Sequence, residues 1–215
     1  SGLREHLQRF LPPRLATVND VSAETAAISV VGPDSILMLA RLALGRSVEQ
    51  ASLDTAGEGA WFCSGAPESS SDFPSDGTMV VRTEEVWPNA WTVFGPADAL
   101  RALWLELAAE GAKPSGLGVW TTLRVEAGRP AFGTDMDENT LPPEVGHVAR
   151  AIDHTKGCYT GQEVIVRIRD RGHVNKHLRL LDLGDMPAPR CGSELIASDG
   201  SGKVVGNLTS VVQSP

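Results

Sequence analysis

A short segment that carries a thiol between two glycines is the part of the sequence best suited to chemistry. It reads Lys156-Gly157-Cys158-Tyr159-Thr160-Gly161-Gln162-Glu163. The glycines permit positive φ angles and a close approach of a ligand to the backbone. The nearby lysine favours the thiolate, the form of cysteine that acts as a nucleophile or metal ligand. The segment therefore predicts a functional Cys158 assisted by Lys156, and the alternative is a glycine-rich turn around a packed structural thiol.

A second segment, closer to the N-terminus, is rich in carboxylates. It comprises Leu123-Arg124-Val125-Glu126-Ala127-Gly128-Arg129-Pro130 and then Asp135-Met136-Asp137-Glu138-Asn139-Thr140-Leu141-Pro142-Pro143-Glu144. An acid held by its neighbours can accept paired hydrogen bonds from a ligand, which makes Glu126 and Asp135 the candidate acceptors. Glu126 has two further interpretations, because it could pair with Arg124 on a strand face or cap a turn.

The two segments resemble the signature motifs of the folate-binding YgfZ family, whose members serve iron–sulfur cluster maintenance. The thiol segment is similar to K-G-C-[FY]-x-G-Q-E, and the acidic segment is similar to L-R-x-E-A-G and D-M-D-E-x-T-L-P-x-E. That family is related to the aminomethyltransferase (T-protein) of the glycine cleavage system, whose members typically lack the cysteine at the position of Cys158. The resemblance implies a tetrahydrofolate-binding cavity, a cytoplasmic or organellar site of action, and partners among iron–sulfur assembly proteins or client enzymes, such as those that modify tRNA.

The resemblance also implies a set of ligand-binding side chains. The pterin edge of folate offers donors that suit the carboxylate of Glu126 or Asp135, and the acidic tail of folate suits the basic stretch that follows Arg150. Tyr159 either stacks on a ring or packs inside the protein, while Gln162 and Glu163 are expected to orient the Cys158 loop. The predicted cofactor-binding residues are Glu126, Asp135, Tyr159, Gly157, Gly161, Gln162, Glu163 and Arg124, with no metal site.

The functional hypotheses differ in what folate is used for. The main one is a tetrahydrofolate-binding accessory protein for iron–sulfur cluster assembly or repair, without independent turnover. The alternative is a folate-dependent aminomethyltransferase or another one-carbon transfer enzyme, and a weaker third is an interaction module that keeps only the fold. Members of the superfamily usually carry a further segment before the point where Ser1 begins, which in aminomethyltransferases supplies the catalytic aspartate. We therefore expect a chain shortened at this end, with weaker folate binding.

Composition limits the remaining classes. A net charge of −8 argues against a broad nucleic-acid surface, although basic residues gather between Arg150 and Arg179. The three cysteines, Cys63, Cys158 and Cys191, form no C-x-x-C pair, which fits a reducing compartment and argues against a cluster held by four cysteines of this chain. No apolar run is long enough to cross a membrane. We expect a cytoplasmic protein with reduced thiols.

The pattern of apolar residues predicts an α+β fold, and the family resemblance implies that this fold is of the aminomethyltransferase-like, folate-binding type. Two strand–helix units are expected, with strands at 26–31 and 90–94 and helices at 36–44 and 97–109. Leu100, Leu103, Trp104 and Leu107 fall at helical spacing and predict a core-facing stripe. A short strand is expected at 15–20, an N-terminal helix before Pro12, and a loop at 64–78.

The C-terminal part contains one conflict and one clear turn. Residues 163–169 alternate in a strand-like way, but the family resemblance implies that a helix begins there, and we favour the helix. Segments 194–197 and 204–212 flank a glycine-rich turn and predict a hairpin. We interpret the hairpin as the start of a small antiparallel β-barrel that is cut short, so that the fold is truncated at both ends. The expected domains are 1–112, 113–175 and 176–215.

Overall fold

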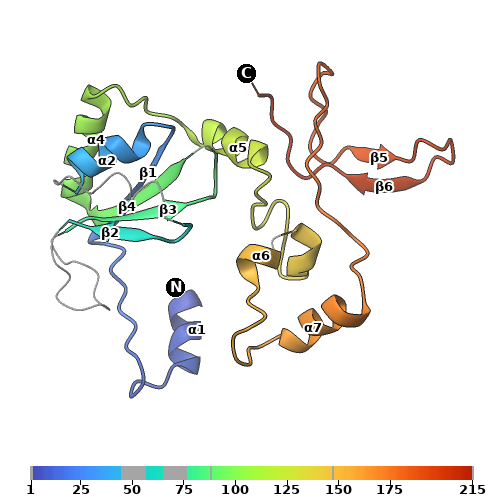
Figure 1. Ribbon diagram of the computed structural model, residues 1–215, viewed down its shortest axis with the longest axis horizontal. Coiled ribbons are helices and arrows are strands. Elements are labelled where there is room, and N and C mark those ends of the chain that lie inside the picture. Colours follow the sequence, from blue (N-terminus) through green and yellow to red (C-terminus); the bar gives the residue numbers. More distant parts are fainter. Residues whose placement is uncertain (1, 45–56, 65–76, 88, 147, 215) are drawn as a thin grey trace. The chain divides into compact units, whose positions relative to one another are not determined.

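The computed structural model describes residues 2–44, 57–64, 77–87, 89–146 and 148–214. The chain divides into two compact units, Ser1–Pro114 and Ser115–Pro215. Each unit has its own sheet and its own helices (Figure 1). The finer division of the second unit near residue 175 stays a prediction.

The first unit is built on one antiparallel sheet. Neighbouring strands follow the order β1-β4-β3-β2, and Ile28 of the first strand lies opposite Val93 of its neighbour. The two predicted strand–helix units are confirmed, and their strands, β1 and β4, pair with each other, with β1 at one edge of the sheet. The two remaining strands were not predicted, because each is short. The elements are α1 (Gly2–Phe10), β1 (Thr25–Val31), α2 (Ser35–Leu42), β2 (Trp61–Cys63), β3 (Met79–Thr83), β4 (Ala90–Pro96) and α4 (Ala97–Ala109).

The hydrophobic core of this unit lies between the sheet and the helices α2 and α4 (Figure 1). Val80 and Val93 alternate with half-buried residues on their strands, and Leu39 and Leu100 cover them from the helices. The expectation that Trp104 joins this core was wrong, because its side chain is 44% exposed. The buried face of α4 is formed by Leu100, Leu103 and Leu107. The indole of Trp104 lies at the edge of this face.

Two further expectations concern the N-terminal region and a loop. The N-terminal helix is confirmed as α1, but none of its residues is buried. The strand expected at 15–20 does not form, since these residues make a turn followed by irregular chain. A segment with strand propensity forms a strand only when it pairs with a neighbouring strand. No strand of the described residues pairs with this segment. Most of the loop expected at 64–78 lies outside the described residues.

The second unit consists of short helices and one hairpin. The predicted hairpin is confirmed, and Leu195 lies opposite Gly206 in it. The described residues of this unit form only this two-stranded sheet and no closed barrel, so the barrel is not confirmed. The elements are α5 (Leu117–Glu126), η1 (Pro142–Val145), α6 (Val148–Ala151), α7 (Gln162–Arg171), β5 (Glu194–Ile196) and β6 (Val204–Asn207).

Two segments of this unit read as strands but fold as helices. Glu126 ends helix α5, so the interpretation that places it on a strand face was wrong. The alternating segment 163–169 lies within α7, which confirms the helix that the family resemblance implied. Helical spacing places Glu163 beside Arg167, and it buries Ile165. These contacts override the weak strand preference of the β-branched residues.

Candidate functional site

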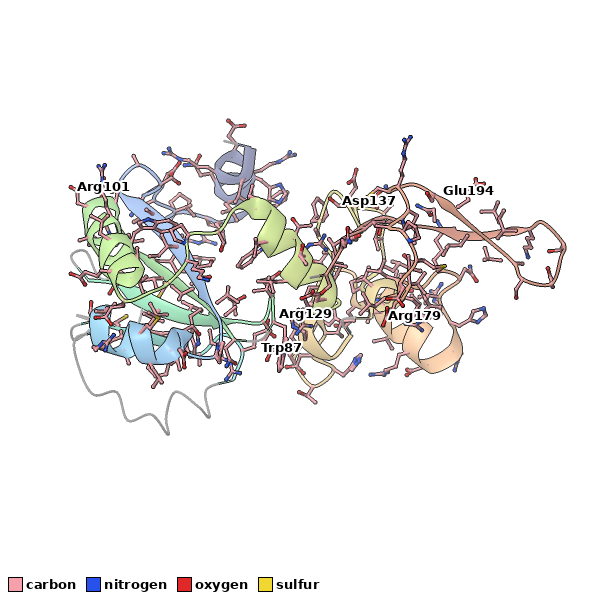
Figure 2. The ribbon with its side chains drawn as sticks, turned by 90° about the horizontal axis from the view of Figure 1, so that it is seen from above. Trp87, Arg101, Arg129, Asp137, Arg179 and Glu194 are labelled. Atoms are coloured by element: carbon pink, nitrogen blue, oxygen red, sulfur yellow. The ribbon has the colours of Figure 1, made fainter. Side chains whose placement is uncertain are left out.

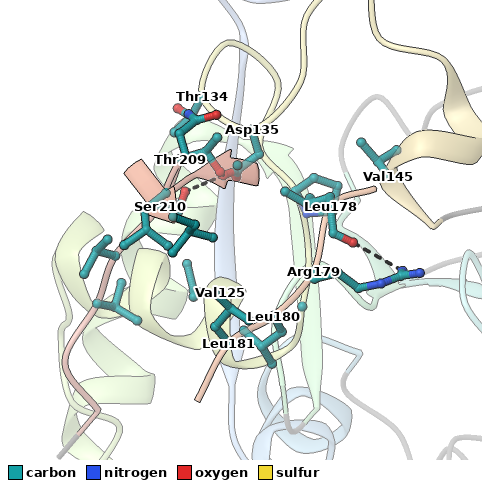
Figure 3. Close-up of a pocket in the computed structure, with 18 of the residues that line it drawn as sticks. Val125, Thr134, Asp135, Val145, Leu178, Arg179, Leu180, Leu181, Thr209 and Ser210 are labelled. Carbon is teal, nitrogen blue, oxygen red and sulfur yellow. Dashed lines mark hydrogen bonds between the residues drawn. The ribbon is translucent and has the colours of Figure 1, made fainter. Parts of the chain in front are cut away.

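Asp135 is the centre of a buried polar cluster in the second unit. Its Oδ2 lies 2.7 Å from Arg124 Nη1 and accepts the backbone N–H of Ala131 at 2.9 Å. Its Oδ1 accepts hydrogen bonds from the hydroxyls of Thr209 at 2.5 Å and Ser210 at 2.7 Å. The side chains of Arg124 and Asp135 are only 9% and 4% exposed. Both oxygens of Asp135 therefore have partners inside the protein, and Figure 3 shows Thr209 and Ser210 beside it.

The ionisation of Asp135 reflects these partners. Burial by itself would raise the pKa of this carboxyl. The hydrogen bonds from Thr209, the Ala131 amide, Ser210 and Arg124 outweigh burial and lower the pKa below its usual value. A buried carboxylate that is paired and fully bonded holds segments together. Its geometry fits that structural task, and its role as a ligand contact stays a prediction.

Arg124 is equally engaged. Besides its pair with Asp135, its Nη1 donates to the carbonyl of Arg129 at 2.5 Å and its Nη2 donates to the hydroxyl of Ser210 at 3.0 Å. The guanidinium thus joins the end of α5 to the C-terminal segment. Thr209 and Ser210 were missed by the sequence reasoning, because nothing in local spacing pairs a tail hydroxyl with a carboxylate far upstream.

Glu126 differs from Asp135 in being exposed. One of its carboxylate oxygens, Oε1, accepts a hydrogen bond from the hydroxyl of Ser214. That is the only hydrogen bond found for this carboxylate in the described part of the chain. Of the two predicted acids, Glu126 is therefore the one with acceptor positions left for a ligand.

An open concavity of about 1950 Å³ lies within the second unit, and both acids line it. Its walls come from the end of α5, the loop around Asp135, the chain after α7 and the C-terminal segment (Figure 3). Leu178, Leu180 and Leu181 contribute apolar surface. Three basic side chains from two separate parts of the chain, Arg129, Lys176 and Arg179, line it as well, and Figure 2 labels the first and the last of them. The concavity combines apolar walls with a few charged groups, as ligand sites commonly do.

The thiol segment forms an ordered turn that leads into α7. The N–H of Gln162 donates to the carbonyl of Tyr159 at 3.2 Å, and the side-chain oxygen of Gln162 accepts the N–H of Tyr159 at 3.1 Å. Between them Gly161 has φ 87° and ψ −5°, a conformation that favours glycine at the third position of such a turn. Gln162 therefore braces this turn, and its predicted role in orienting Cys158 for function stays a prediction. Glu163 instead forms an ion pair with Arg167 at 2.7 Å on α7.

Lys156 and Tyr159 lie against each other on the two sides of Cys158. The Lys156 Nζ is 4.8 Å from the centroid of the Tyr159 ring, within the range of a cation–π contact. The hydroxyl of Tyr159 is buried and has no hydrogen-bond partner among the described residues. The Lys156 backbone is held by Asp153, whose Oδ1 accepts its N–H at 3.3 Å. The lysine that was predicted to assist the thiol is thus found on the aromatic ring beside it.

The three cysteines are free and differ in their surroundings. Cys158 and Cys191 are exposed, whereas Cys63 is half-buried on β2. Burial raises the pKa of the Cys63 thiol, which disfavours its reactive thiolate form. The functional role of Cys158 stays a prediction.

The described residues contain neither a group of metal-ligating side chains nor a membrane-spanning helix. No cluster of three or more metal-ligating side chains is found in the parts of the chain that the structure covers. No helix among them is long and apolar enough to cross a membrane.

Comparison with known proteins places the chain in a family. The model of the GCVT N-terminal domain matches residues 2–156, which include the first unit, helix α5 and Asp135. This chain belongs to the GCVT N-terminal domain family. The family match ends just before Cys158, so the thiol lies outside the matched residues. The match supports the wider aminomethyltransferase-like relationship that the motifs implied, and it does not distinguish the YgfZ subfamily.

Relatives of this GCVT-family chain are named aminomethyltransferase. One from Prochlorococcus marinus (strain MIT 9313) is 32% identical over 215 residues, which cover 99% of this chain and 53% of the relative. One from Thermosynechococcus vestitus is 29% identical over 213 residues, covering 97% of this chain and 52% of the relative. One from Bordetella petrii is 44% identical over 72 residues, covering 34% of this chain and 20% of the relative. The chain spans about half the length of the first two of these relatives.

Proposed function

We propose that the protein binds tetrahydrofolate in the concavity of the second unit. The observation that carries this proposal is the exposed carboxylate of Glu126 on the wall of that concavity. A pterin edge presents adjacent N–H donors, and a carboxylate with free lone pairs is the acceptor that matches them. Both oxygens of Asp135 already have protein partners, so Glu126 is the stronger candidate of the two acids for the ligand contact.

The concavity also offers partners for the other end of folate. The tail of folate ends in carboxylates, and Lys176 and Arg179 line the concavity. The leucines beside them supply apolar surface for the ring that joins the two ends. A volume of about 1950 Å³ leaves room for a ligand of this size.

Calorimetric titration of the protein in its natural full length with tetrahydrofolate tests this function. We expect Glu126→Gln to weaken binding about tenfold or more, since hydrogen bonds to charged groups are worth roughly 1.5–3 kcal/mol. Glu194→Gln is the matched control, because this acid is exposed on β5 and does not line the concavity. Absence of binding by the unmodified protein would overturn the proposal.

For the use of the bound folate, the names of the relatives favour one-carbon transfer. Proteins similar to this chain over nearly all of its length are named aminomethyltransferase. In such a reaction folate, when bound, carries the transferred carbon. The residues of this chain would bind and orient it through Glu126 and the basic side chains of the concavity.

A second use, support of iron–sulfur enzymes, is favoured by Cys158. This free thiol is exposed on a turn that Gln162 and Gly161 hold in place, and its segment follows the K-G-C-[FY]-x-G-Q-E pattern. A thiolate can serve as a nucleophile or as a ligand for iron. This role needs the thiol, whereas a transfer that depends on Glu126 does not.

Replacement of the two exposed cysteines separates these uses. If the protein supports iron–sulfur enzymes, Cys158→Ser abolishes the rescue of iron–sulfur enzyme activity in cells that lack the protein, and Cys191→Ser, the matched control, does not. If it transfers one-carbon units, both variants keep the aminomethyltransferase turnover of the unmodified protein. Equal rescue by both variants would eliminate the thiol-dependent role.

A further inference from the structure

The C-terminal segment Thr209–Ser214 is joined to the acidic motif by three hydroxyl groups. Thr209 and Ser210 donate to Asp135, and Ser214 donates to Glu126. All five residues line the same concavity, and Figure 3 shows the contacts of Asp135 with the tail. The segment is therefore part of the wall of the proposed site.

The contacts of Asp135 and the contact of Glu126 differ in how many hydrogen-bond acceptor positions they leave for a ligand. Asp135 is buried, and each of its oxygens has protein partners, so this contact anchors the segment. Glu126 and Ser214 are both exposed, and their contact engages only one carboxylate oxygen of Glu126 among the described residues. A carboxylate offers about four lone-pair positions, and one serine hydroxyl uses one of them. The contact therefore restrains Glu126 without consuming its capacity to bind a ligand.

We infer that Ser214 is a positioning residue that holds the Glu126 carboxylate ready for a ligand with two adjacent N–H donors. This inference rests on the proposed folate function and adds a residue that acts through Glu126. A free glutamate side chain must lose rotamer freedom when it binds. A hydroxyl that already orients the carboxylate removes part of that cost before the ligand arrives. The anchor at Asp135 keeps the segment in place while Ser214 does so.

The chemical consequence is selectivity for the donor edge of the ligand. A ligand that presents both N–H donors gains from an oriented carboxylate, because the two hydrogen bonds must form together. An analogue that lacks one donor gains much less. Loss of Ser214 should therefore reduce the affinity for the complete edge more than the affinity for the incomplete one.

The test uses the full-length protein, tetrahydrofolate and an analogue that lacks the 2-amino group of the pterin. We expect Ser214→Ala to weaken tetrahydrofolate binding by about three- to tenfold, the range for ordering one flexible side chain. Binding of the analogue should change little. Ser214→Thr, which keeps the hydroxyl, should restore the selectivity, and Ser198→Ala, an exposed serine in the hairpin turn, should leave both affinities unchanged.

The outcomes separate this inference from the function on which it rests. If the unmodified protein binds neither ligand, the folate function fails and the role of Ser214 fails with it. If the unmodified protein binds tetrahydrofolate and Ser214→Ala does so with unchanged affinity and selectivity, the folate function stands and the positioning role is overturned. An equal loss for both ligands, accompanied by a lower melting temperature, would assign Ser214 a purely structural role and would also overturn it.

Discussion

Ser210 and Asp135 lie 75 positions apart in the sequence, yet the hydroxyl of Ser210 donates to Asp135 Oδ1 at 2.7 Å. The same hydroxyl accepts a hydrogen bond from Arg124. Three segments of the second unit therefore meet at one buried ion pair: helix α5, the loop of the acidic motif, and the C-terminal segment.

Removal of the Asp135 carboxylate should destabilise the protein strongly. Asp135→Ala leaves the Arg124 charge buried without its partner, and breaking a buried pair in this way costs about 3–5 kcal/mol in the free energy of unfolding. Denaturant titration measures the effect. Asp185→Asn is the control, because this acid is exposed and should change stability by less than about 0.5 kcal/mol. Equal effects of the two substitutions would show that the ion pair does not hold the unit together.

The contribution of Asp135 should also depend on pH. Its pKa in the folded protein is lowered, since burial, which raises it, is outweighed by the hydrogen bonds from Thr209, Ala131, Ser210 and Arg124. The pKa of an aspartate carboxyl in an unfolded chain is about 3.9. The stabilisation is therefore fully present above that value and is lost as the pH falls through the lower folded value. The difference in unfolding free energy between the unmodified protein and Asp135→Asn should shrink below about pH 4, and a constant difference down to acid pH would contradict this assignment.

The two glycines beside Cys158 should respond differently to substitution. Gly161 has φ 87°, so Gly161→Ala forces a left-handed conformation on alanine at a cost of about 1–2 kcal/mol. Gly157 has no positive φ, and no atom of the described residues lies within 4 Å of an added Cβ, so Gly157→Ala is the matched control and should be tolerated. Thermal unfolding measures the stability, and thiol labelling of Cys158 reports on the turn. A larger loss of stability for Gly157→Ala would mean that the backbone is restrained at Gly157 and not at Gly161.

Tyr159→Phe should not destabilise the protein. The hydroxyl of Tyr159 is buried and finds no hydrogen-bond partner among the described residues, and such an unpaired group costs roughly 1–3 kcal/mol. Phenylalanine keeps the ring against Lys156 and removes the unpaired group. We expect a slightly higher melting temperature and unchanged folate binding. A loss of folate binding with normal stability would instead show that the hydroxyl contacts the ligand.

Two positions on α4 test where the core of the first unit ends. Leu100 is 2% exposed, and Leu100→Ala should cost about 2–5 kcal/mol in unfolding free energy. Trp104 is 44% exposed, so Trp104→Ala should cost less, although it removes more atoms. Denaturant titration of both variants gives the order. A larger loss of unfolding free energy for Trp104→Ala than for Leu100→Ala would mean that Trp104 is part of the core.

The local sequence was sufficient to predict those helices and strands that depend on contacts between residues close together in the chain. The strands at Ala90 and Thr25, helix α4 and the C-terminal hairpin follow from apolar periodicity and turn residues, because each depends on neighbours a few positions away. The helix at Gln162 is a partial exception. Its residues alternate like a strand, and only the family resemblance indicated the helix that the structure has.

The sequence also selected the acidic segment as a candidate site, but only the tertiary structure decided where its two candidate acids lie. Asp135 and Glu126 are equivalent candidates in the sequence, yet one is buried among protein donors and the other is exposed on the concavity. The difference comes from Thr209, Ser210 and Ser214, which only folding brings to the acidic motif. Hydrogen bonds between such distant segments leave no periodic signal, because they depend on how the chain returns and not on its local pattern.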